Sequence, residues 1–381
     1  MKAVRIGIVF DTNMGWARGE VRGVIAYARD HRLPWVFAGG AATPATWRLF
    51  RRWKPHGLVV DDGWREEVRR LDVPMVASLI PEPAGSAVLD NDGIGRAAGE
   101  HLLARGFRHL AFVGAREMPW AAERGNGFRA KWREVVGGRP DASFHRLDLR
   151  SEAVMDWRPG RAELAAWLCG LPKPAGILAC RDLRAREVVD VCRTLRLRVP
   201  EDVAVVGVDN DDLVCDLSDP PLSSVRVPWE QIGCHMGAHL RQRLQGEGRP
   251  WSPPLVRGGD VAVRRSSDTY AVSDEAVAQA CRHIQEHAAE RLSVAAIASA
   301  ISLSRRGLER RFRRQLARSP RQVIEQVRLR MAQQLLRDTA IPVAVVSEKS
   351  GFGSHQRLIA VFRRFAGQTP GAYRARHQPR R

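Results

Sequence analysis

The sequence predicts an α/β domain followed by an all-α domain with two helix-turn-helix units. Over the first 265 residues, short apolar strands alternate with helical stretches, a pattern typical of parallel sheets with right-handed crossovers. Near the C-terminus, Phe312–Arg314 and Pro320 recur 50 residues later as Phe362–Arg364 and Pro370. Charge is the third observation: residues 274–381 hold 21 Lys and Arg against 8 Asp and Glu, so +13 of the net charge of +19 lies there.

Length and composition narrow the class of protein. A chain of 381 residues suggests two or three domains. The apolar stretch Ile6–Phe10 is too short for a signal peptide, and no segment approaches the 18 apolar residues of a membrane helix. We therefore expect a cytoplasmic protein without a membrane partner. The six cysteines show neither Cys-x-x-Cys nor zinc spacing, so reduced thiols and no metal are expected: Cys169, Cys180, Cys192, Cys215, Cys234 and Cys281.

The α/β domain has six clear strand candidates, several of them followed by a helix. In parallel sheets, ligands bind at the carboxyl ends of the strands. The expected strands are Arg5–Phe10, Gly57–Val60, Pro74–Ser78, His109–Val113, Gly176–Ala179 and Val203–Val208. The expected helices include Glu20–Asp30, Gly95–Arg105 and Ala185–Leu195.

Polar residues follow the apolar runs repeatedly. Asp11, Asp90–Asn91, Arg181–Asp182 and Asp209–Asn210 each come directly after such a run. Converging carboxylates, amides and guanidinium groups suit a polyol or sugar, and Trp16 could cover the apolar face of a sugar ring. For any single Asp, capping of the following helix is the alternative.

Three longer runs indicate a known architecture. Asp90–Gly95, His109–Gly114 and Val206–Asn210 resemble the effector domain of the lactose/galactose repressor family, which shares its fold with periplasmic sugar-binding proteins. The resemblance covers about residues 4–265 and implies one sensor domain of two lobes, which we place at residues 1–265. This chain starts directly with the first sensor strand, whereas that family carries its helix-turn-helix at the N-terminus.

The resemblance also implies roles for three residues. In that family, an Arg three residues ahead of a Gly-aromatic pair grips sugar hydroxyls, and Arg124 stands so before Gly127-Phe128. Asp209 matches the sugar-binding Asp after the late strand, and Asp182 matches the polar position before a short helix. The implied ligand-binding set is Asp11, Trp16, Asp90, Asn91, Arg124, Asp182 and Asp209.

Helical periodicity starts after a polar segment, residues 266–273, which we interpret as a linker. The DNA-reading domain is therefore placed at residues 274–381. Asp274 is a candidate N-cap for a helix ending near Arg291. Ser293 and Ser304 then cap the two expected helices of the first unit, Val294–Ala300 and Arg305–Leu316.

The second of these helices divides into an apolar stripe and a basic face. Leu308, Phe312 and Leu316 recur at the helical period and should be buried. On the other face, Arg306 and Arg310 can each grip guanine, and Glu309 can accept from cytosine N4. Later arginines suit phosphates. The expected DNA contacts of this helix are Arg305, Arg306, Glu309, Arg310, Arg313 and Arg314.

The second unit repeats the arrangement. A helix from Ile341 to Lys349, a Gly351-Phe352 turn and a helix from His355 to Phe365 leave His355, Gln356 and Arg357 for the groove. A long helix, about 320–337, should hold the two units near one helical turn of DNA apart. The alternative for either copy is a solvated charged helix face, which the second copy argues against.

This domain resembles the arabinose-regulator family of activators. The matching residues span about 100 positions: Ser304, Leu308, Phe312, Ser319, Pro320, Arg328, Ala332, Leu335, Leu336, Gly351, Phe352, Phe362, Gly367, Thr369, Pro370, Tyr373 and Arg374. In the sensor, Cys180–Arg186 and Asp209–Leu213 most resemble regulators of xylose use. The resemblance implies a homodimeric activator that binds an operator in double-stranded DNA, responds to xylose or a similar sugar, contacts RNA polymerase and needs no cofactor.

Two other classes of protein fit part of the chain. An exported sugar-binding protein needs a signal peptide and no basic tail. A Rossmann-type enzyme needs a Gly-x-Gly-x-x-Gly or Walker A motif, and the sequence has neither. The remaining alternative is a cytoplasmic sugar-binding protein, or a Rossmann-like enzyme, whose basic tail does not read DNA specifically. We expect no catalytic activity.

Overall fold

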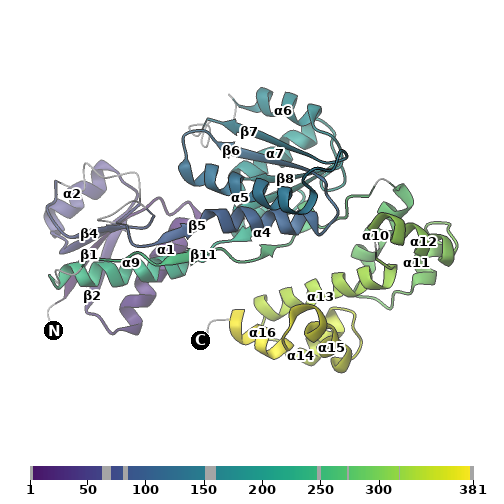
Figure 1. Cartoon of the computed structure of the whole chain (residues 1–381). Helices are drawn as coiled ribbons and strands as arrows, with labels where there is room; N and C mark the ends of the chain where they lie inside the picture. The colour runs from purple at the N-terminus through teal and green to yellow at the C-terminus, as the bar shows by residue number, and fades with distance from the viewer. Residues whose placement is uncertain are drawn as a thin grey trace. The chain divides into compact units, whose positions relative to one another are not determined.

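The computed structural model describes residues 3–61, 70–79, 85–150, 160–246, 250–272, 274–316 and 318–377. The chain divides into two compact units (Figure 1). The first comprises residues 1–104 and 108–268, and the second comprises residues 105–107 and 269–381.

The first lobe of the first unit is a parallel sheet with strand order β2-β1-β3-β4. Helices α1 and α9 cover one face, where Ile6 and Ile8 pack with Met236 and Leu240. Helix α2 covers the other through Phe50. The elements are β1 (Val4–Val9), α1 (Gly15–Asp30), β2 (Trp35–Gly40), α2 (Pro44–Trp53), β3 (Gly57–Val60), β4 (Met75–Ala77) and α9 (Trp229–Leu244).

The second lobe is a six-stranded sheet of order β12-β10-β9-β8-β6-β7, parallel except for β12. Its described elements are α4 (Asn91–Leu103), β6 (His109–Ala115), α5 (Pro119–Val136), β7 (Ser143–Leu149), α6 (Arg161–Gly170), β8 (Ala175–Ala179), α7 (Asp182–Thr194), β9 (Val203–Asp209), α8 (Asp212–Asp216), β10 (Ser223–Arg226), β12 (Val261–Ala262) and the 3₁₀ turn η2 (Arg265–Ser267).

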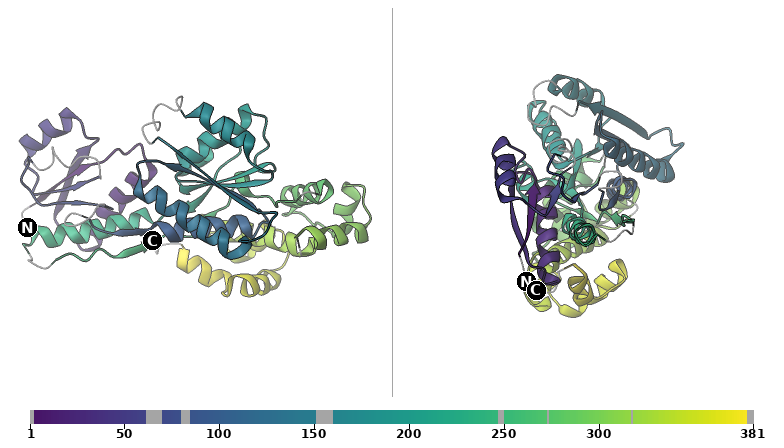
Figure 2. Two further views of the ribbon diagram at one scale, coloured as in Figure 1. Left: turned by 45° about the horizontal axis from the view of Figure 1, so that its top comes forward. Right: turned by 90° about the vertical axis from the view of Figure 1, so that its left-hand side faces the viewer.

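The chain passes between the lobes three times. It leaves the first lobe after β4, returns after β10 to form α9, and leaves again after α9. Two of these crossings pair as short parallel strands, β5 (Val88–Asp90) and β11 (Leu255–Arg257), which can be followed between the two sheets in Figures 1 and 2.

The second unit is helical and has two apolar cores that share one helix. Val323 and Val327, in the first half of α13, pack with the helices of the first helix-turn-helix unit. Leu329 and Leu336, in its second half, pack with the helices of the second. The helices are α10 (Glu275–His287), α11 (Val294–Ala300), α12 (Arg305–Leu316), α13 (Pro320–Asp338), α14 (Val343–Lys349), α15 (His355–Ala366) and α16 (Pro370–His377).

The fold class of the sequence prediction is confirmed: an α/β domain of two lobes precedes an all-α domain with two helix-turn-helix units. The strands that the prediction omits include β2 and β7, which form edges of their sheets. Both strands are only partly buried: β7 carries polar residues, and β2 ends in two glycines, which disfavour strands. Helix α1 begins at Gly15, five residues earlier than expected at Glu20.

The segment predicted as a linker is packed rather than extended in solvent. Ser266 and Ser267 are buried in the turn η2. The Ser266 hydroxyl accepts from the Ser223 N–H and donates to the Val205 carbonyl. The composition suggested a linker because these serines are polar, but strands β9 and β10 satisfy Ser266, and His101 of α4 lies 2.8 Å from the Ser267 hydroxyl. Ser273 lies outside the described residues.

Helices α1 and α9 pack backbone against backbone. A Cβ atom added to Gly23 would lie 2.0 Å from the Glu230 carbonyl oxygen, and one added to Gly233 would lie 2.0 Å from the Glu20 carbonyl oxygen. Neither helix can approach the other so closely with a larger residue at these positions.

We expect Gly23→Ala to destabilise the sensor domain by about 1–3 kcal/mol, because the methyl group forces two backbones apart. Gly170→Ala, in a helix with no atom within 4 Å of the added Cβ, is the matched control and should be neutral or stabilise by up to about 1 kcal/mol. Urea unfolding of both variants measures the difference, and equal midpoints would contradict the packing argument.

Candidate effector site and DNA-reading helices

Three predicted ligand residues come together at the carboxyl ends of β8 and β9. Arg124 of α5 is only 4% exposed. Its Nε donates to Asn91 Oδ1 at 3.0 Å, and its Nη1 donates to the Cys180 carbonyl at 2.6 Å. Asp209, the last residue of β9, places Oδ1 3.9 Å from the same Nη1. The guanidinium is thus fixed from two sides and faces a carboxylate.

Asp209 has an unusual environment. Its Oδ1 is buried and has no hydrogen-bond partner among the described residues. Burial raises its pKa to about 6, although the charges of Arg124 and Arg181 oppose that shift. Its φ of 109° is strained for a residue with a side chain. A buried acceptor held in a strained backbone is a candidate contact for a ligand hydroxyl.

The structure gives other predicted carboxylates protein partners. Asp182 is buried, and it accepts from the Ser224 hydroxyl at 2.5 Å and the Asp211 N–H at 2.8 Å. Burial, and then the charge of Asp209, raise its pKa well above the usual value. Asp90 caps α4 by accepting from the Gly93 N–H, as the capping alternative describes. Asp11 accepts from the Asn13 N–H in the turn before α1. Ligand contact by these three residues stays a prediction.

Aromatic rings lie near both sides of this network. Trp16 is half-buried between Phe10 and Trp229, with ring centroids 6.3 and 6.2 Å away. The Trp120 ring lies under the Arg124 guanidinium at 4.8 Å. The sequence prediction did not include Trp120 or Trp229. Trp229 follows the carboxyl end of β10. The sequence prediction considered only polar residues at the carboxyl ends of strands, so it passed over this tryptophan.

Asp211 connects the two lobes. Its carboxylate accepts from the Gly15 N–H at 2.7 Å and from Arg18 Nη2 at 3.2 Å, while its own N–H donates to Asp182. Met14, at the N-cap of α1, provides no side-chain cap. A residue of the second lobe therefore caps the first helix of the first lobe, which explains why α1 starts earlier than its own sequence indicates.

The predicted contacts of α12 lie on its exposed face. Arg306, Arg310 and Arg313 are exposed. Arg305 and Glu309 form an ion pair with each other at 3.0 Å, so their charges partly cancel without DNA. Arg314 lies 3.4 Å from Asp274, the carboxylate that caps α10.

The second helix-turn-helix has the same exposed arrangement. His355, Gln356 and Arg357 form the first turn of α15 and are exposed. The Ser354 hydroxyl caps this helix by accepting from the Arg357 N–H. The Arg357 side chain lies 3.6 Å from Glu325 of α13. Both sets of predicted readers are thus accessible, each at or near the start of a helix.

Within the described ranges, no group of three or more His, Cys, Asp or Glu side chains is placed to hold a metal ion. Among the same residues, no helix is long and apolar enough to cross a bilayer.

Two family models match the chain. A periplasmic binding protein-like domain matches residues 99–267, and a helix-turn-helix domain matches residues 297–376. The matches agree with the architecture described above, a sensor followed by a DNA-binding domain.

Two curated relatives align over most or nearly all of the chain. The xylose operon regulatory protein of Escherichia coli (strain K12) is 31% identical over 392 residues, covering 98% of this chain and 97% of its own. That of Haemophilus influenzae is 30% identical over 75% of this chain and 73% of its own. The solved structure of a xylose-binding transcription activator, xylR, aligns over 100% of both chains with a TM-score of 0.64 and 29% identity. The chain therefore belongs to the family of xylose operon regulatory proteins and is a DNA-binding transcription regulator.

Proposed function

We propose that this regulator activates a carbohydrate-utilisation operon when xylose or a closely related sugar binds at Arg124 and Asp209. The observation that carries the proposal is this buried pair: Asn91 and Cys180 hold the guanidinium, and the buried Oδ1 of the carboxylate opposite has no hydrogen-bond partner among the described residues. One group donates and the other accepts, which matches the two functions of a sugar hydroxyl. The names of the two curated relatives support xylose as the first sugar to test.

The contacts of Asp211 explain how sugar binding could change the arrangement of the two lobes. A ligand at Asp209 lies two residues from Asp211, whose carboxylate caps α1 of the other lobe. A sugar that binds better when this cap is made shifts the population toward closed lobes. We infer that closure, rather than a local change at the DNA helices, is the signal.

The output in this proposal is sequence-specific DNA binding by α12 and α15. Arg306 and Arg310 read guanine, Arg313 and Arg314 bind phosphate, and His355, Gln356 and Arg357 read the second groove segment. The expected partners are an operator duplex, a second copy of the chain in a homodimer, and RNA polymerase. We place the protein in the cytoplasm and assign it no catalytic step.

Asp209→Asn tests the effector site. The change nearly preserves shape but replaces an ionised acceptor with an amide, and a charge-assisted hydrogen bond contributes about 1.5–3 kcal/mol. Sugar affinity measured by calorimetry should fall roughly 10- to 100-fold, while operator affinity without sugar stays at the wild-type value. Unchanged sugar affinity would remove Asp209 from the site.

The raised pKa of Asp209 predicts a pH dependence. Above about 6 the carboxylate is ionised and accepts from the sugar, whereas below it protonation removes that charge. Sugar affinity should therefore decline as pH falls through about 6. The Asp209→Asn variant should show no such decline, and a matching decline in both proteins would assign the effect to another group.

Arg306→Ala and Arg310→Ala test the reading helix. Each change should cost about 1–3 kcal/mol on a duplex that the wild-type chain selects from a random pool, with a much smaller effect on unselected DNA. Titration of both duplexes at one salt concentration gives the ratio. If the loss of affinity is equal on the two duplexes, these arginines bind phosphate, and the proposal that α12 reads base edges is wrong.

A further inference from the structure

We propose that a hollow between the two helix-turn-helix units binds a backbone phosphate of the operator; this inference rests on the proposed DNA binding. The hollow has a volume of about 530 Å³. Its lining comes from α12, from α15 and from the start of α13, and comprises Arg313, Arg318, Ser319, Arg321, Gln322, Glu325 and Arg364. Arg313 and Arg364, which α12 and α15 contribute, come late in those helices, beyond the residues expected to read bases.

The charges of the lining favour an anion. The lining holds four guanidinium groups and one carboxylate, and the planar guanidinium fork matches two phosphate oxygens. Arg313, Arg321 and Arg364 are exposed, so a ligand can reach their guanidinium groups. The backbone at the start of α13 is already satisfied, because Ser319 and Gln322 form a capping box. The arginine side chains therefore supply the binding.

Glu325 holds Arg321 and Arg364 at the hollow before DNA arrives. This carboxylate is only 8% exposed, and it lies 3.5 Å from Arg321, 3.6 Å from Arg357 and 3.9 Å from Arg364. Three positive charges share one negative charge, so attraction for a phosphate remains. Glu325 is a positioning residue, since it acts through the arginines and would itself repel the ligand.

The DNA backbone fits this hollow better than a free phosphate metabolite does. Both reading helices contribute an arginine to the lining, and both belong to the same compact unit. A strand that runs between two successive major-groove segments presents phosphates between these helices. A phosphate held there fixes the register of both units at once.

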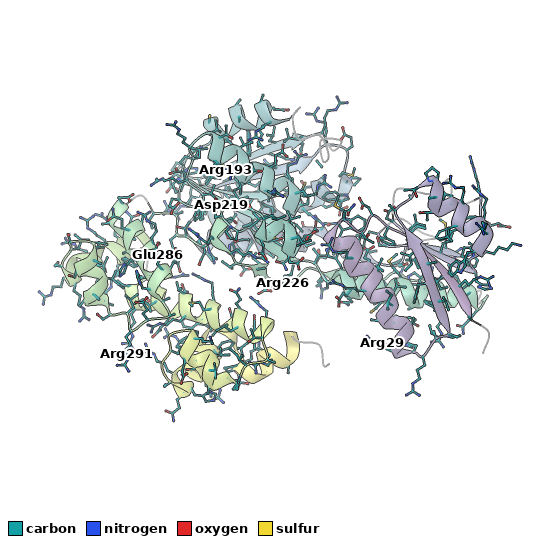
Figure 3. The ribbon with its side chains drawn as sticks, turned by 180° about the vertical axis from the view of Figure 1, so that it is seen from behind. Arg29, Arg193, Asp219, Arg226, Glu286 and Arg291 are labelled. Carbon is teal, nitrogen blue, oxygen red and sulfur yellow. The ribbon has the colours of Figure 1, made fainter. Side chains whose placement is uncertain are left out.

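The test uses the full chain with Arg321→Gln and Arg364→Gln. Arg291→Gln is the matched control, because Arg291 is an exposed arginine in the turn between α10 and α11 of the same unit (Figure 3). Affinity is measured from about 50 to about 200 mM salt on a selected and on an unselected duplex. Each hollow variant should lower the slope of log affinity against log salt by about 1 and weaken both DNAs alike. The control should match wild type, and Arg321→Lys, which keeps the charge, should restore most of the slope.

Each opposite result has its own meaning. Wild-type slopes in both Gln variants would overturn the hollow as a phosphate site and leave DNA binding intact. Failure of the wild-type chain to bind DNA would instead overturn the proposed function. Calorimetry with inorganic phosphate separates the two sources of phosphate: binding that Arg321→Gln abolishes while the DNA slopes stay unchanged would overturn the assignment to DNA.

Discussion

The hydrogen bonds of the Asp211 carboxylate are the constraint on which the sensor depends. Helix α1 begins with a glycine whose N–H has its acceptor 196 residues later, in the other lobe. A Cβ at Gly15 would lie 2.4 Å from that carboxylate oxygen, so the contact requires a residue without a side chain. Because Asp211 also donates its N–H to Asp182, one small polar network joins the two lobes to the candidate effector site.

Burying the polar groups of this network costs free energy, and the hydrogen bonds between them offset part of that cost. Asp182 is surrounded by donors, and Arg124 has partners on two nitrogens. Asp209 is the exception, with one buried oxygen that has no hydrogen-bond partner among the described residues. Buried acceptors in folded proteins are usually satisfied. A ligand that supplies a hydroxyl donor would complete the network, so affinity and local stability are linked here.

Much of the fold followed from periodicity in the sequence. Helices α11 and α12 occur with the expected bounds, since caps and apolar spacing are both local signals. The start of α1 could not be predicted, because its cap comes from a distant residue. The candidate effector residues were predicted partly from the resemblance to a known family. The prediction missed Trp120 and Trp229, because only the three-dimensional arrangement shows that they adjoin Arg124 and Trp16. Likewise, the pairing of Arg357 with Glu325 depends on how α15 packs on α13.

Helix α13 belongs to the cores of both helix-turn-helix units, and Arg328 fixes it further by donating to the Ala288 and Glu290 carbonyls. A continuous helix cannot twist or stretch to follow a changed operator. One base pair inserted between the two recognised segments rotates one segment by about a tenth of a turn relative to the other. The base sequence of each segment can drift while some affinity remains, but the number of base pairs between them cannot. Under the proposed reading by α12 and α15, the spacing of the two operator segments is therefore constrained more tightly than their base composition.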